Sequence, residues 1–150
     1  MKKSLMGLLV VLVILIMSVP ASAATKMGIG YNNSGTPLGM KIWLTDSFGL
    51  DFGVGFNSSA NAQNFGLEAA VDLVVAKADP VFLELRGGMA MNFGQVTNLY
   101  WPLGFNIEYY VTKNLSLNMG LGIQLALENT AFRISSFCNT TGGLGVIYYF

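Results

Sequence analysis

The chain alternates apolar residues with small or polar residues, with a period of two, along most of its length. The final stretch shows the pattern best, with Leu144, Val146, Tyr148 and Phe150 on one face and Gly143, Gly145, Ile147 and Tyr149 on the other. A period of two is that of a β-strand, whose successive side chains point to opposite faces. A half-exposed strand of a soluble protein pairs its apolar face with a charged or hydroxylated one, whereas the second face here is largely glycine. The stretch predicts a strand with hydrocarbon on one side and a crowded protein interior on the other.

Seven earlier segments alternate in the same way, and turn residues end each of them. They cover residues 26–31, 38–44, 50–57, 65–75, 83–93, 101–111 and 115–128. Most are close to the length of about 9–11 residues that a tilted transmembrane strand needs. The longest loop is expected at about residues 129–141, before the last strand. The fold class predicted is all-β, an eight-stranded antiparallel up-and-down transmembrane β-barrel.

Composition distinguishes a membrane barrel from a soluble one. Of the whole chain, 53% is hydrophobic and only 11% is charged. In lipid every backbone polar group must be bonded internally, and a closed barrel achieves this. The alternative is a lipocalin-like barrel with its apolar face inside, but its water-facing surface would then consist of glycine, alanine and a handful of charges, which form strands weakly. The sequence favours the membrane barrel.

Aromatic residues on the apolar face gather near the two ends of the expected strands, and aliphatic residues lie between them. If the first strand runs outward, one girdle lies at the outer rim and consists of Tyr31, Phe56, Phe65, Phe93 and Trp101. The other lies at the periplasmic rim and consists of Tyr109, Tyr148 and Phe150. Two aromatic girdles around an aliphatic band are typical of transmembrane barrels. An even number of strands leaves both termini in the periplasm.

The amino terminus has the three parts of a secretory signal peptide. Lys2 and Lys3 precede an apolar run at 5–17, and small residues follow at 21–24. We expect residues 1–23 to be the signal peptide, with cleavage after residue 23 or 24, and 24–150 to be the barrel. A retained anchor is the alternative, but the run is shorter than the roughly 20 residues of a spanning helix.

Few other chemical features stand out after residue 24. Without Lys2 and Lys3 the chain has six basic and eight acidic side chains, and no basic patch predicts nucleic-acid binding. The single cysteine, Cys138, cannot form an internal disulfide, and we interpret it as an unreactive loop thiol.

The last strand carries a resemblance to a known family. Val146, Tyr148 and the terminal Phe150 match the alternating apolar assembly signal of small outer-membrane β-barrels, and the chain resembles the eight-stranded OmpA/OmpX-like members over all of residues 24–150. Residues 44–56 are also similar to the second hairpin of that family. The resemblance implies the outer membrane of a Gram-negative-type cell, with its lipid and the barrel-assembly machinery as partners. In contrast to OmpA itself, we expect no peptidoglycan-binding domain after the barrel, and we expect outer loops shorter than those of OmpX-like adhesins.

Charged residues fall on the inward face of the expected barrel and predict an interior ion network. Its members are Lys41, Asp51, Glu68, Asp72, Glu84, Arg86 and Glu108. Folding the hairpins about Ala78 and Val96 places Glu84 opposite both Asp72 and Glu108. A filling network of paired charges, a gated ion path and a catalytic carboxylate pair are the alternatives. Eight strands leave room for side chains and little else, which favours the filling network.

The chain contains no histidine, so the usual general base and the usual zinc ligand are absent. We therefore expect no enzymatic activity, no metal and no cofactor. In the loop at 129–141, the exposed residues Phe132, Arg133 and Phe137 are candidate surface contacts, or a lid over the barrel mouth. The function predicted is a structural or surface-interaction role for an unknown ligand. The alternative is a porin-like narrow pore or small-ligand pathway through the lumen.

Overall fold

The computed structural model describes residues 26–31, 36–59, 62–94, 97–128, 131–138 and 145–150. The expected signal peptide lies outside these ranges. The described residues form nine strands: β1 (Lys26–Tyr31), β2 (Leu38–Trp43), β3 (Phe48–Ser59), β4 (Ala62–Ala78), β5 (Val81–Phe93), β6 (Asn98–Tyr110), β7 (Leu115–Glu128), β8 (Ala131–Cys138) and β9 (Gly145–Tyr149). Over the same ranges, no helix is long and apolar enough to cross a membrane.

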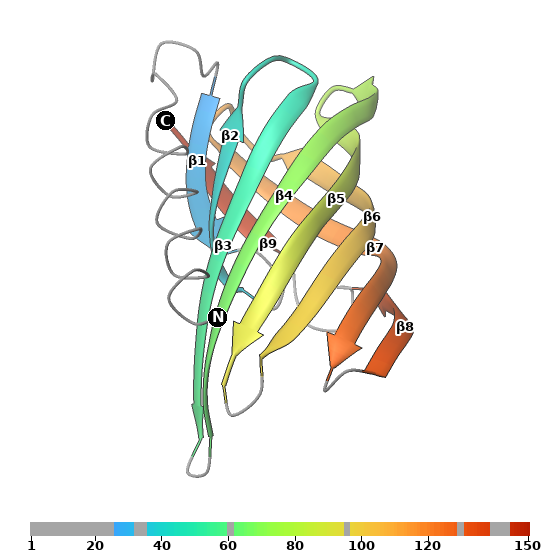
Figure 1. The fold of residues 1–150 in the computed structure, drawn as a ribbon. Helices are drawn as coiled ribbons and strands as arrows, with labels where there is room; N and C mark the ends of the chain where they lie inside the picture. The colour runs from blue at the N-terminus through green and yellow to red at the C-terminus, as the bar shows by residue number, and fades with distance from the viewer. Residues whose placement is uncertain (1–25, 32–35, 60–61, 95–96, 129–130, 139–144) are drawn as a thin grey trace.

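The strands close into one antiparallel barrel (Figure 1). Each of β1 to β7 pairs with the next strand along the chain, and β9 pairs with β1 to complete the circle. The eighth place in the wall is shared by two strands in succession. β8 pairs with the later part of β7, at Leu121–Glu128, and β9 pairs with its first part, at Leu115–Asn118. The predicted closed eight-stranded antiparallel barrel is confirmed.

The prediction of a long loop at residues 129–141 is wrong, because most of this segment forms the strand β8. Phe132 and Ile134 pair with Leu127 and Leu125 of β7, and so continue the outward apolar face. The alternation here spans only two apolar positions before two serines, which is too short for a clear period of two. The ladder of backbone hydrogen bonds along β7 extends the strand beyond what that pattern indicates.

The β4–β5 hairpin has a different register from the one expected. Its turn lies at Asp79–Pro80, beyond the expected pivot, and a bulge at Val75 shifts the pairing again. Asp72 therefore lies opposite Arg86 and not opposite Glu84. A one-residue extension on either side of a turn moves every cross-strand partner, and the sequence pattern does not locate the bulge.

The β5–β6 hairpin is shifted in the same way. Glu84 lies opposite Asn106, and Arg86 lies opposite Gly104, so the expected direct pairing of Glu84 with Glu108 is wrong. The inward and outward faces are unchanged, because the shift equals two residues. Both carboxylates stay inside the barrel.

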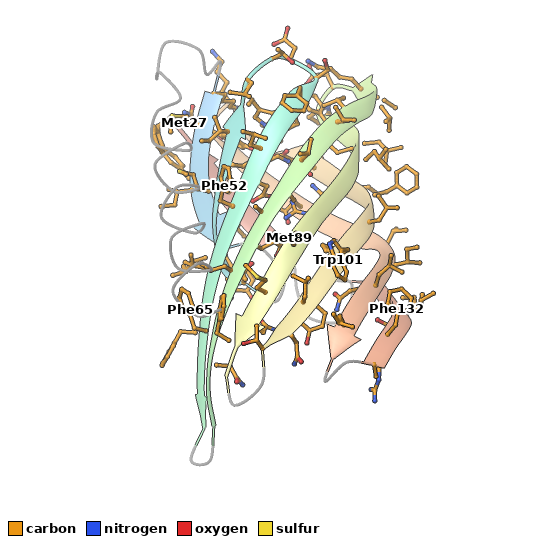
Figure 2. The ribbon with its side chains drawn as sticks, viewed as in Figure 1. Met27, Phe52, Phe65, Met89, Trp101 and Phe132 are labelled. Atoms are coloured by element: carbon orange, nitrogen blue, oxygen red, sulfur yellow. The ribbon has the colours of Figure 1, made fainter. Side chains whose placement is uncertain are left out.

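The barrel is apolar outside and charged inside. Ile29 and Leu38 on the outer face are 60% and 65% exposed, whereas Lys41, Asp72 and Glu84 on the inner face are at most 1% exposed. Figure 2 shows side chains such as Phe65, Trp101 and Phe132 around the outside of the strands. This distribution is the reverse of the usual one, in which charged residues are almost never fully buried.

The residues expected in the aromatic girdles lie on the outer face of the barrel. Six are exposed: Tyr31, Phe56, Phe65, Tyr109, Tyr148 and Phe150. Phe93 and Trp101 are half-buried. The rings of Phe65 and Phe93, on neighbouring strands, stack with centroids 6.4 Å apart. These two aromatic side chains therefore cover one another along the wall as well as facing outward.

Candidate functional site

Lys41 of β2 is the centre of one half of the interior network. Its Nζ lies 2.7 Å from an oxygen of Glu84, 3.0 Å from one of Glu108 and 3.5 Å from one of Asp72. These carboxylates come from β5, β6 and β4, so the lysine crosses the lumen and contacts strands that are not its neighbours in the sheet. A cation that is 1% exposed is tolerated only with such partners.

Arg86 of β5 is the centre of the other half. Its guanidinium donates to Asp51 and lies 2.9 Å from Glu68 and 3.5 Å from Asp72. The planar group presents several N–H donors at fixed angles, and so serves three carboxylates at once. Asp72 contacts both cations and joins the two halves. The structure thus brings all seven residues expected in the network into contact.

Five carboxylates share these two cations, and they are incompletely satisfied. Among the described residues, Asp72 Oδ2 and Glu84 Oε1 are buried without a hydrogen-bond partner. Asp72 Oδ2 still lies 3.5 Å from Lys41 Nζ, whereas Glu84 Oε1 carries the desolvation cost of a buried oxygen without a hydrogen bond. The network therefore depends strongly on each cation.

Four polar residues that the sequence reasoning missed complete the network. Thr36 donates to Glu68 at 2.8 Å, Asn106 to Glu84 at 2.8 Å, Ser116 to Glu108 at 2.5 Å and Tyr149 to Glu108 at 2.6 Å. All four are uncharged, so a search for charges does not find them. Asn106, Ser116 and Tyr149 occupy inward register positions on strands, which is the indication that the sequence offers. Thr36 precedes β2 and has no such position.

Tyr149 links the last strand to the interior. Its hydroxyl donates to Glu108 and accepts from Trp43 Nε1 at 3.3 Å, and its side chain is fully buried. The strand β9 also pairs with β1, so this contact lies next to the closure of the barrel. It explains why the inward face of the last strand is not glycine alone.

We expect Tyr149→Phe to lower the free energy of unfolding by about 1–3 kcal/mol, because it removes a hydrogen bond to a buried carboxylate. Urea titration in detergent micelles measures the change. Tyr148→Phe is the matched control, because the Tyr148 side chain is exposed on the outer face. Equal effects of the two substitutions would contradict the role given to the Tyr149 hydroxyl.

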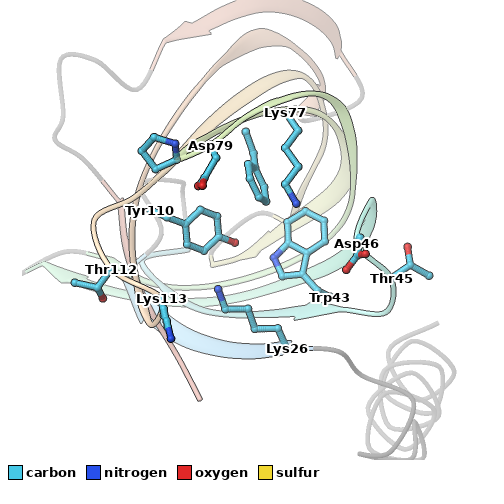
Figure 3. Close-up of a pocket in the computed structure, with 11 residues that line it drawn as sticks. Lys26, Trp43, Thr45, Asp46, Lys77, Asp79, Tyr110, Thr112 and Lys113 are labelled. Atoms are coloured by element: carbon cyan, nitrogen blue, oxygen red, sulfur yellow. The ribbon is translucent and has the colours of Figure 1, made fainter.

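A pocket of about 440 Å³ opens at the end of the barrel that carries the short turns (Figure 3). The turns after β2, β4 and β6 contribute to its rim. Trp43, Phe82 and Tyr110 line it, together with Lys26 and other polar residues. We call this pocket the vestibule. Trp43 also lies over the network, with Lys41 Nζ 4.6 Å from its ring.

The expected surface contacts lie on β8 and not on a loop. Phe132 is 61% exposed on the outer face, and Arg133 is exposed on the opposite face of the strand. The backbone of Phe137 pairs with Gly122. Cys138, also expected in the loop, ends the same strand. These positions form part of the barrel wall, so the interpretation of an apolar loop that folds over the mouth is wrong.

The residues of the expected assembly signal lie on and just after β9. Val146, Tyr148 and Phe150 are all exposed on the outer face. Among the described residues, no group of three or more side chains has the composition and spacing to hold a metal ion. Comparisons with protein-family models, with curated proteins and with solved structures found no match.

Proposed function

We propose that this chain is an integral β-barrel of a bacterial outer membrane, with a structural or surface-interaction role. The observation that carries the proposal is the reversed distribution of side chains. An exposed belt that includes Ile29, Val54, Leu103 and Leu121 surrounds a buried set of charges. Such a surface is unfavourable in water but matches the hydrocarbon of a bilayer, because lipid-facing and lumen-facing residues alternate in transmembrane barrels.

The likeness to OmpA/OmpX-like barrels supports the same location. It rests on the eight-stranded closure and on Val146, Tyr148 and Phe150 at the end of the chain. In this proposal the end with the short turns faces the periplasm, as does each terminus of the barrel. The signal peptide at residues 1–23 and the barrel-assembly machinery would bring the chain to the membrane.

The network favours a closed lumen over a pore. Lys41 and Arg86 extend from β2 and β5 to carboxylates on other strands, and so occupy the middle of the barrel interior. An eight-stranded barrel has little interior space beyond that of its side chains. The network also argues against catalysis, because Ser116, the serine beside Glu108, is fully buried and a substrate would not reach it.

Electrophoresis with and without boiling tests the proposal. The protein of the membrane fraction should keep its closed form in detergent and migrate differently once boiling has unfolded it. A matched sample of the soluble fraction is the control. A single heat-independent band found in the soluble fraction would contradict the membrane location.

Planar-bilayer recording distinguishes the closed barrel from the narrow pore. We expect the unmodified protein to be silent, because paired side chains cross the lumen. Steady conductance that changes in Arg86→Ala but not in Arg133→Ala would instead support the pore. The two arginines differ in place, since Arg86 lies in the network and Arg133 on β8.

A further inference from the structure

We propose that the vestibule is a binding site for a small organic anion, a carboxylate or phosphate attached to a compact apolar or aromatic body. This goes beyond the proposed function, and it rests on the geometry of the pocket alone. The volume of about 440 Å³ lies within the range of about 300–1,000 Å³ that small-molecule sites occupy.

The positive charge of the chain gathers at this pocket. Of the four lysines that follow residue 25, three line the vestibule, Lys26, Lys77 and Lys113, and the fourth belongs to the interior network. The rim also carries Asp46 and Asp79. Three ammonium groups against two carboxylates give this mouth a positive balance, although the chain after residue 25 has more acidic than basic side chains.

Two of the three ammonium groups lie against aromatic rings. Lys26 Nζ lies 4.1 Å from the ring centroid of Tyr110 and 4.2 Å from that of Tyr149, and Lys77 Nζ lies 4.5 Å from that of Phe82. Within the described part of the chain, neither lysine forms an ion pair. Cation–π contact uses one side of an ammonium and neutralises none of its charge, so the other side remains for an anion.

The floor of the vestibule suits an apolar body. The ring of Tyr110 packs 5.0 Å from that of Phe82 and 5.7 Å from that of Tyr149, measured between centroids. Trp43 lines the same space (Figure 3). A planar ligand could stack on the rings that line the pocket while its anionic group contacts Lys26 and Lys77. Tyr149 is fully buried and does not line the pocket, so it packs against Tyr110 without meeting the ligand. Because Trp43 covers Lys41 on its other side, the floor separates such a ligand from the interior network.

The two tryptophans of the chain provide the test. Trp43 lines the vestibule, whereas Trp101 lies on the outer face of β6, so Trp101→Phe leaves a single reporter in the pocket. We would titrate this variant in detergent micelles with phenyl phosphate and follow its fluorescence. We expect a saturable change, which Lys26→Gln weakens by about tenfold, the loss of roughly one charge-assisted contact.

The controls separate the anion site from general charge and from the ring floor alone. Arg133→Gln removes the same unit of charge on β8 and should leave the affinity unchanged. Lys77→Gln is a second test at the exposed rim, where a folding defect is least expected, and it should weaken binding as Lys26→Gln does. Heat-dependent mobility of each variant confirms that it folds, independently of ligand binding.

Three outcomes would overturn the proposal. One is the absence of a saturable signal with phenyl phosphate in folded protein. Another is tighter binding of benzyltrimethylammonium, which would make the rings and the two aspartates a cation site. The third is binding of inorganic phosphate as tight as that of phenyl phosphate, which would show that the apolar body of the ligand contributes nothing to binding. Because the mobility assay is read separately, none of these results bears on the membrane location.

Discussion

Lys41→Met should lower the free energy of unfolding by about 3–5 kcal/mol, the range measured when one partner of a buried ion pair is removed. Lys41 is 1% exposed, and Glu84, Glu108 and Asp72 are its partners. Methionine fills the space of the lysine stem but leaves Glu84 and Glu108 without a cation, and leaves Asp72 with Arg86 alone. Urea titration in detergent micelles, followed by the fluorescence of the tryptophans, measures the loss.

Lys77→Met is the matched control. Lys77 is exposed at the rim of the vestibule and makes no ion pair with a described residue, so the same substitution there should change the stability by less than about 0.5 kcal/mol. Equal effects at the two positions would show that the network contributes nothing beyond a general loss of charge.

A compensating substitution tests the cause of the loss. Glu84→Gln removes one of the three carboxylates around Lys41 and keeps an amide oxygen that can accept from Asn106. Combined with Lys41→Met, it should restore part of the lost stability, with a coupling energy of about 0.5–3 kcal/mol. Strictly additive effects would mean that the two side chains do not interact as the structure places them.

The inward charges of the network could be predicted because a strand has a strict period of two. Any residue placed on the correct face, such as Lys41 or Asp51, lies in the lumen whatever the register. Which residues contact each other could not be predicted, because that depends on the turn at Asp79–Pro80 and on the bulge at Val75. These features change the cross-strand partners but leave the network residues on their faces. Beyond the bulge the alternation of β4 is offset by one residue, which places Lys77 on the vestibule side.

Other parts of the structure leave little trace in the sequence pattern. The strand β8 has two apolar outward positions before its serines, Phe132 and Ile134, and the backbone ladder with β7 extends it beyond them. The vestibule is assembled from residues far apart in the chain, such as Lys26 and Tyr110. Closure of the barrel brings them together, so the sequence pattern predicts neither the pocket nor its positive charge.

Closure itself can be tested at a single glycine. Gly30 of β1 lies opposite Ile147 of β9, in the ladder that completes the barrel. A Cβ at this position would overlap the carbonyl oxygen of Val146 and lie 2.8 Å from the Cα of Ile147. These are backbone atoms and cannot rotate away, so β1 and β9 must separate to admit even a methyl group.

We therefore expect Gly30→Ala to lower the fraction of protein that reaches the heat-modifiable closed form, with a loss of stability of at least the roughly 1–3 kcal/mol typical of overpacking. Gly87→Ala is the matched control on β5. There the new Cβ would lie 3.4 Å from a side-chain methyl of Leu103, which is ordinary contact, and alanine adds to the outward apolar face. If Gly30→Ala folds as well as Gly87→Ala, then β1 and β9 do not form the close seam described here. If only Gly30→Ala fails, the near absence of side chains on the inner face of β1 is a requirement of closure, because it lets the first and last strands approach.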